Sequence, residues 1–71
     1  MKKKTAEQVL RDMITLLTTY LKELSQTFGL PISEFVYGEK TAYVECLEWI
    51  QQWEHAKENG LNFDVEKRFP L

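Results

Sequence analysis

Residues 36–55 read VYGEKTAYVECLEWIQQWEH and hold two tyrosines, two tryptophans, the only cysteine and the only histidine of the chain. Such a concentration of distinctive side chains is typical either of a chemical site or of the inner face of a helix. When successive residues are rotated by about 100°, the stretch separates into an apolar side and a polar side. We therefore interpret it as the centre of an amphipathic helix, and this interpretation decides the fold.

The apolar side of this helix carries most of its aromatic residues. It is formed by Phe35, Ala42, Tyr43, Cys46, Leu47, Trp49, Ile50, Trp53 and Ala56. The opposite side is formed by Thr41, Glu45, Glu48, Gln51, Gln52 and His55. Trp49 and Trp53 are four residues apart, so we expect them to form one packing stripe.

The same rotation separates the cysteine from the histidine. Cys46 and His55 point in opposite directions, which excludes a Cys–His catalytic pair within the helix. We interpret Cys46 as an inert core residue, because a free cysteine behaves as a small buried hydrophobe. We interpret His55 as a solvated residue near a helix end. Its partner on the same face is Glu48, but Gln52 stands where the Glu-x-x-His pattern of metal-binding bundles needs a glutamate.

Glu39 is the anomaly of the segment, because a continuous helix places this carboxylate in the middle of the apolar side. One interpretation is that the helix bends at Gly38, since glycine weakens a helix by about 1 kcal/mol relative to alanine, or that Glu39 reaches the edge. The other is that Glu39, Tyr37 and Tyr43 form a buried polar network or a recognition spot. The sequence leaves both open.

A first helix is expected over residues 6–28. Thr5 and Gln8 have the spacing of a capping box, and Gly29 followed by Pro31 predicts the end of the helix. The apolar residues between these signals are spaced 4, 3, 4, 3 and 4 apart, as in a packed helix seam. They are Leu10, Ile14, Leu17, Leu21, Leu24 and Phe28.

The second helix is expected over residues 34–59, with Ser33 as its N-cap and Gly60 as its stop. The remaining residues form a C-terminal arm over 60–71. The arm alternates apolar and polar residues at its start, which predicts an extended strip laid over the core. Equally, Asp64 has the position to cap a single helical turn that runs through Lys67.

These elements predict an all-α fold, in which an antiparallel two-helix hairpin carries the C-terminal arm packed on it. Residues 1–71 then form a single helical domain. The apolar arc of the second helix spans about half of its circumference, which is more than one neighbouring helix covers. The arm covers the rest, or a second copy does so in a dimeric four-helix bundle. The chain has 71 residues and one cysteine, and its lack of a disulfide favours the dimer.

The charge is uneven along the chain. The formal net charge is −2, with +2 on residues 1–33 and −4 on residues 34–71. This balance argues against a general nucleic-acid binder, which would carry a basic face over much of the fold. Polar residues also interrupt any apolar run long enough to span a membrane or form a signal peptide. We therefore expect a cytoplasmic protein with a reduced thiol.

No catalytic motif, phosphate-binding loop or cluster of metal ligands is present in the sequence. We expect a small non-enzymatic module for protein–protein interaction or self-association, without cofactor, metal or small-molecule substrate. Its expected partner is a second copy, in a homodimer, or another protein. The candidate interaction surface consists of Tyr37, Glu39, Tyr43, Trp49 and Trp53. The alternative is a small nucleic-acid-associated regulator that uses Lys2, Lys3, Lys4 and Arg11.

Residues 37–71, which read YGEKTAYVECLEWIQQWEHAKENGLNFDVEKRFPL, resemble a group of short uncharacterised bacterial proteins associated with mobile genetic elements. The resemblance covers about half of the chain. Because the group has no assigned activity, the resemblance implies no catalytic or binding residue. It implies a bacterial cytoplasmic accessory protein.

Overall fold

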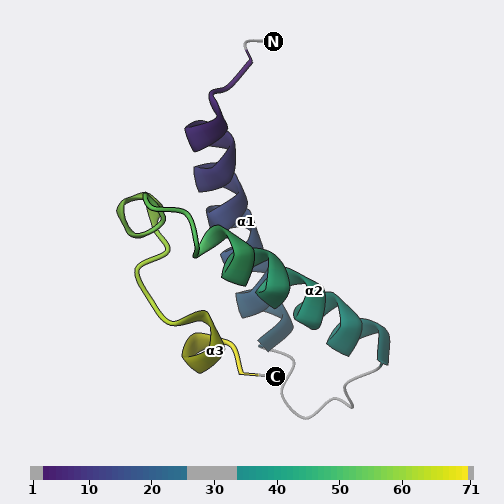
Figure 1. Cartoon of the computed structure of the whole chain (residues 1–71). Helices are drawn as coiled ribbons and strands as arrows, with labels where there is room; N and C mark the ends of the chain where they lie inside the picture. Colours follow the sequence, from purple (N-terminus) through teal and green to yellow (C-terminus); the bar gives the residue numbers. More distant parts are fainter. Residues whose placement is uncertain (1–2, 26–33, 71) are drawn as a thin grey trace.

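The computed structural model describes residues 3–25 and 34–70. Two long helices, α1 (Ala6–Ser25) and α2 (Glu34–Ile50), are followed by the short helix η1 (Lys57–Asn59) and the single turn α3 (Val65–Arg68). Figure 1 shows α2 running back obliquely across α1, with the chain after α2 folded beside both helices. The all-α helical hairpin is therefore confirmed, and no strand occurs within the described residues.

The first turn of α1 closes as its sequence predicts. The Gln8 amide N–H donates to Thr5 Oγ1 at 3.2 Å, and the Thr5 amide N–H donates to Gln8 Oε1 at 2.9 Å. This reciprocal pair satisfies two backbone donors that a helix start leaves without partners. The structure describes α1 as far as Ser25. The predicted end at residue 28, with Gly29 and Pro31, lies outside the described residues.

One hydrophobic core holds the two helices and the arm together. The seam of α1 supplies buried leucine and isoleucine side chains, as its 4-3-4 spacing predicts. Three aliphatic residues of α2 and four residues of the chain after α2 complete the core. Its buried members are Ile14, Leu17, Leu21, Val44, Leu47, Ile50, Ala56, Leu61, Val65 and Phe69.

Helix α2 is unbroken at Gly38 but ends nine residues before its predicted boundary. Gly38 lies inside the helix, so the break at Gly38 that the sequence left open does not occur. The predicted end at Asn59 is wrong, because α2 stops at Ile50. After it, the Gln52 amide N–H donates to the Trp49 carbonyl and later amides also reach back three residues, which tightens the chain into turns.

The turns after α2 bring the chain back to α1. A straight helix would carry Ala56 away from the core, whereas the turned chain buries it together with Leu61. Gly60 ends η1 with a φ of 107°. The Leu61 amide N–H donates to the Ala56 carbonyl, and the Gly60 amide N–H donates to the Lys57 carbonyl, which is the bond pattern of a Schellman motif. Gly60 therefore ends a helix, as predicted, but the helix that it ends is η1 and not α2.

The C-terminal arm packs against the core through one helical turn and not as an extended strip. Asp64 Oδ1 accepts hydrogen bonds from the amide N–H groups of Glu66 and Lys67 at 3.0 and 3.3 Å. This cap starts α3, which directs Val65 and Phe69 into the core. Of the two interpretations that the sequence left open, the capped turn is confirmed.

Candidate interaction surface

The five residues of the predicted interaction surface do not form one continuous surface. Trp49 is 73% exposed and Tyr37 is 49% exposed on α2. Tyr43 and Trp53 instead pack against the core, and Glu39 is half-buried. The structure therefore leaves Trp49 and Tyr37 open to a partner and uses Tyr43 and Trp53 to support the fold.

The predicted tryptophan stripe is wrong for two physical reasons. Because α2 ends at Ile50, Trp53 no longer lies one turn above Trp49 on the same helix. The face of α2 that packs on α1 is also not the aromatic one. It is formed by Val44, Leu47 and Ile50, whose aliphatic side chains interdigitate with the leucine seam of α1.

Cys46 is exposed, so its predicted place in the core is also wrong. The exposure of Cys46 follows directly from the orientation of α2. Neighbouring residues on a helix are about 100° apart, so the turn that directs Leu47 into the core directs Cys46 away from α1. His55 is exposed as expected and lies 3.4 Å from a carboxylate oxygen of Glu54 and of Glu58.

Tyr43 meets α1 at a small junction beside the core, and the charge of Glu39 acts on it there. The rings of Tyr20 and Tyr43 pack with their centroids 5.5 Å apart and their planes tilted by 37°. Partial burial raises the pKa of the Tyr43 hydroxyl, and the negative charge of Glu39 and the neighbouring Tyr20 raise it further. Glu39 thus acts on Tyr43 through its charge, at the edge of the helix contact.

The outward side of α2 combines two large aromatic residues with small ones. Phe35 is 77% exposed and Trp49 is 73% exposed. Between them Gly38, Ala42 and Cys46 are also exposed. On a helical wheel the five residues fall within roughly 80° of one another. We call these five residues the outer face of α2.

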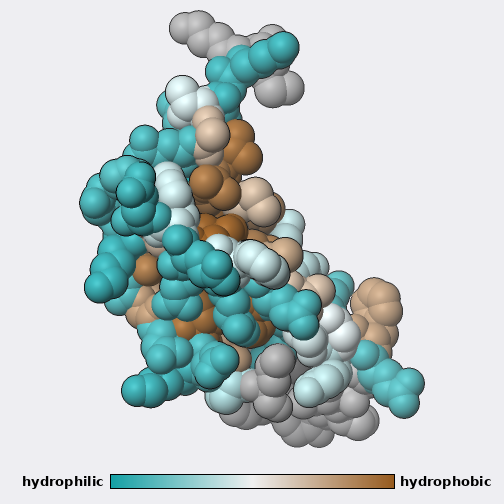
Figure 2. Space-filling model, viewed as in Figure 1, coloured by the Kyte–Doolittle hydropathy of each residue, from teal (hydrophilic) through white to brown (hydrophobic). Residues whose placement is uncertain are grey.

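A second uncovered apolar strip runs along α1. Val9, Met13, Leu16 and Tyr20 are spaced 4, 3 and 4 residues apart and are all partly exposed. Brown surface in Figure 2 follows the half of α1 that projects beyond its crossing with α2. We call these four residues the lateral strip of α1. Met13 and Tyr20 already widen the apolar arc of α1 in the sequence, but nothing local shows that this side stays partly exposed, with Tyr20 packed on Tyr43 of α2 at one end.

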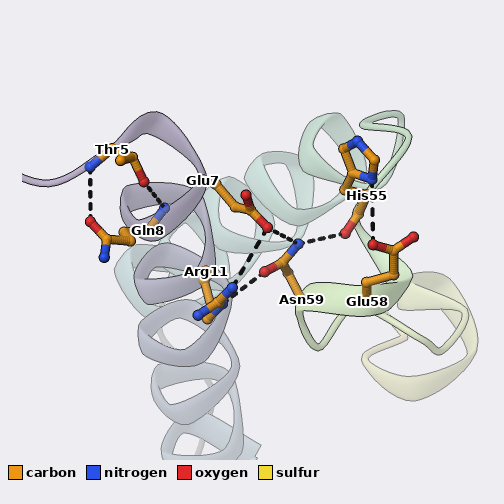
Figure 3. Close-up of polar contacts among 7 residues, drawn as sticks. All are labelled: Thr5, Glu7, Gln8, Arg11, His55, Glu58 and Asn59. Atoms are coloured by element: carbon orange, nitrogen blue, oxygen red, sulfur yellow. Dashed lines mark hydrogen bonds and ion pairs between the residues drawn. The ribbon is translucent and has the colours of Figure 1, made fainter.

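A polar cluster fixes η1 to the start of α1 (Figure 3). Arg11 Nε donates to Asn59 Oδ1 at 2.7 Å. Asn59 Nδ2 donates to the His55 carbonyl at 2.8 Å and reaches Glu7 Oε1 at 3.4 Å. Asn59 is buried, and these partners satisfy its amide. The cluster therefore joins distant parts of the chain. Sequence reasoning missed it because Asn59 lies 48 and 52 residues from Arg11 and Glu7.

Two of the basic residues near the N-terminus, Lys4 and Arg11, have acidic neighbours. Lys4 forms an ion pair with Asp12, and Arg11 Nη2 lies 3.6 Å from Glu7 Oε1 in addition to its bond with Asn59. Their positive charge is thus partly neutralised within the fold. A phosphate backbone would have to compete with these contacts.

No three His, Cys, Asp or Glu side chains among the described residues gather as metal ligands. A hollow of about 530 Å³ that is open to solvent lies between the turns after α2 and the arm. Trp53, Phe63 and Leu61 line it together with Lys57 and Asp64. Within the part of the chain that the structure describes, no helix has the length and hydropathy to cross a membrane.

Comparison of the chain with protein-family models, with curated proteins and with solved structures found no match. The resemblance of residues 37–71 to short bacterial proteins therefore stays a prediction.

Proposed function

We propose that the protein is a small non-enzymatic module that self-associates or binds another protein through the outer face of α2. The observation that carries this proposal is the exposure of Phe35 and Trp49, at 77% and 73%, on a regular helix. Single exposed apolar residues are common on protein surfaces, whereas apolar residues grouped on one helix face are typical of an interaction site.

The energetics favour covering this face. Full burial of a large apolar side chain stabilises by roughly 1.5–3 kcal/mol. Phe35 and Trp49 obtain only a small part of that within one chain, because the core is built from the opposite side of α2. Tryptophan is also among the residues that most often dominate the binding energy of an interface.

The structure changes which residues of α2 we assign to the surface. Trp49 remains a candidate and Phe35 joins it, whereas Tyr37 is exposed but lies outside the outer face. Tyr43 and Trp53 belong to the core contacts. Two chains that meet through α2 would bring together two helical hairpins, as in the dimeric four-helix bundle that the sequence favours. A reducing cytoplasm suits the exposed thiol of Cys46.

A matched pair of double variants tests this assignment. Phe35→Ser with Trp49→Ser removes the large residues of the outer face, and Val9→Ser with Leu16→Ser makes equivalent changes on the lateral strip of α1. We expect size-exclusion chromatography with light scattering, over a concentration series, to show association of the parent chain. The first pair should abolish it and the second should preserve it, while circular dichroism confirms that both remain helical.

Accessibility of Trp49 gives an independent measurement. In the Trp53→Phe variant Trp49 is the only tryptophan, so acrylamide quenching of its fluorescence reports on the outer face alone. We expect efficient quenching at low protein concentration and protection as chains associate or a partner binds. A chain that remains monomeric and shields Trp49 at every concentration would contradict the proposal.

The alternative of a nucleic-acid-associated regulator has no observation in its favour. Lys4 and Arg11, two of the basic residues on which it depends, pair with Asp12 and Glu7.

A further inference from the structure

We propose that the outer face of α2 docks on the same face of a second copy, with the two helices antiparallel and a two-fold axis passing beside Ala42. This inference rests on the proposed function and names the partner. It makes the contact isologous, so that it closes on itself and yields a dimer and not a filament.

The arrangement of large and small residues along the face is symmetric about Ala42. Phe35 and Trp49 lie seven residues before and after it, and Gly38 and Cys46 lie four residues before and after it. In an antiparallel pair centred on Ala42, Phe35 therefore faces Trp49 of the second copy, and Gly38 faces Cys46 of the second copy. Large side chains meet at both ends, about 10 Å from the axis, and small side chains meet in the middle.

The small residues at the centre allow the helices to approach closely. A Cβ atom built on Gly38 would meet no heavy atom within 4 Å, so the space in front of it is open. Helix axes pack 8–10 Å apart, depending on the side chains between them. Glycine, alanine and cysteine permit the shorter separation, at which the two aromatic pairs close the ends of the contact.

The area of the face suits a weak, reversible dimer. Phe35 and Trp49, at 77% and 73% exposure, present roughly 300 Å² per copy, because aromatic side chains bury about 150–250 Å² each. Two copies therefore supply about half of the roughly 1,200 Å² found at the lower limit of specific interfaces. The central small residues and the rims of the face add to this area, so the contact lies at the low end of specific interfaces. We thus expect association in the micromolar range or weaker.

The rims of the face carry like charges. Glu39 lies on one side of it, and Glu34 and Glu45 lie on the other. Two copies bring these carboxylates closer together, so salt should strengthen the dimer by screening their repulsion. A basic protein partner would give the opposite salt dependence, which separates the two kinds of occupant.

Cysteine crosslinking tests the proposed register. In a Cys46→Ser background, Ala42→Cys places one thiol at the two-fold axis, where the two Cα atoms come within the range that a disulfide requires. We expect rapid formation of a covalent dimer under mild oxidation. Thr19→Cys in the same background is the matched control, because Thr19 is also exposed but lies on α1. It should react only at the slow rate of random collisions.

The parent chain and one further variant test whether the paired helices are antiparallel. In the antiparallel dimer the two Cys46 residues lie about 12 Å apart along the helix axes, too far for a disulfide, so the parent chain should not crosslink faster than the Thr19→Cys control. Gly38→Cys with Cys46 retained should crosslink faster than the Thr19→Cys control, because the new thiol of each copy faces Cys46 of the other on both sides of the two-fold axis. Within one chain these two positions are also about 12 Å apart and cannot bridge internally.

The outcomes separate this inference from the proposed function. Rapid crosslinking through Cys46 in the parent chain would overturn the antiparallel register, because a parallel pair places the two Cys46 residues together. Ala42→Cys that links no faster than Thr19→Cys would overturn the inference as well. The proposed function would survive either result if the Phe35→Ser and Trp49→Ser pair still abolished association, and it would fall with the inference if that pair had no effect.

Discussion

Replacement of Gly38 by alanine should stabilise the folded monomer. Gly38 lies in the interior of α2 and does not use a positive φ, since Gly60 is the glycine of the described chain that does. A methyl group at position 38 would meet no atom within 4 Å, so it introduces no clash. Alanine is about 0.8–1.0 kcal/mol more favourable than glycine inside a helix, because it restricts the unfolded chain and favours helical dihedral angles.

The expected gain from Gly38→Ala is therefore about 1 kcal/mol in the free energy of unfolding. For a domain of this size it corresponds to an increase in Tm of about 4–8 °C. Thermal and urea unfolding, followed by circular dichroism at a protein concentration low enough to exclude association, measure both quantities. Reduced or unchanged stability would refute the description of Gly38 as an unstrained, solvent-facing position within a continuous helix.

Gly60→Ala is the matched control and should act in the opposite direction. Gly60 has a φ of 107°, a conformation that residues with a Cβ rarely adopt. The added Cβ would also lie 3.7 Å from Ile14 Cγ2 on α1, which is an ordinary contact. Backbone strain is therefore the dominant effect, and we expect a loss of about 1 kcal/mol. The two substitutions change the stability in opposite directions because the backbone conformation at the two glycines differs.

Three further changes test other parts of the structure. Asn59→Ala removes the buried amide that joins η1 to α1 and should cost about 2 kcal/mol by urea unfolding, whereas the exposed Asn62→Ala should cost little. Asp64→Ala removes the N-cap of α3 and should cost about 1 kcal/mol. The raised pKa of Tyr43 means that its contribution to stability is complete below pH 10, the ordinary pKa, and is lost as the pH rises further. Glu39→Gln should lower the Tyr43 pKa toward that value, as measured by the absorbance of tyrosinate.

The features that could be predicted from the sequence depend on neighbouring residues. The capping box of Thr5 and Gln8 acts over three residues, and its two hydrogen bonds form as expected. The Asp64 cap is equally local. Gly60 was identified as a stop because glycine alone adopts its backbone conformation without strain. In each case the physical cause lies within about one helical turn of the residue concerned.

The orientation of α2 could not be predicted in this way, because apolar residues cover about half of the circumference of the helix, which is more than one neighbouring helix buries. Two faces compete for the core: the aliphatic face of Val44, Leu47 and Ile50, and the outer face that contains Phe35 and Trp49. The aliphatic face packs inward because it matches the leucine seam of α1, a long-range property. The early end of α2 has the same origin, since the turns after Ile50 bury Ala56 and Leu61.

The outer face and the glycine within it are physically connected. As a monomer, the chain retains a destabilising glycine at an exposed position of α2, where alanine would be more stable by about 1 kcal/mol. Close approach of a second helix would explain the presence of glycine at position 38, because each methyl group added at the centre of the contact separates the two helices. Gly38→Ala should therefore raise the stability of the dilute monomer and lower its tendency to dimerise, as measured by light scattering over a concentration series. If the alanine variant gains stability and dimerises as well as the parent chain, Gly38 does not lie at a close helix contact, and the antiparallel pairing about Ala42 is excluded.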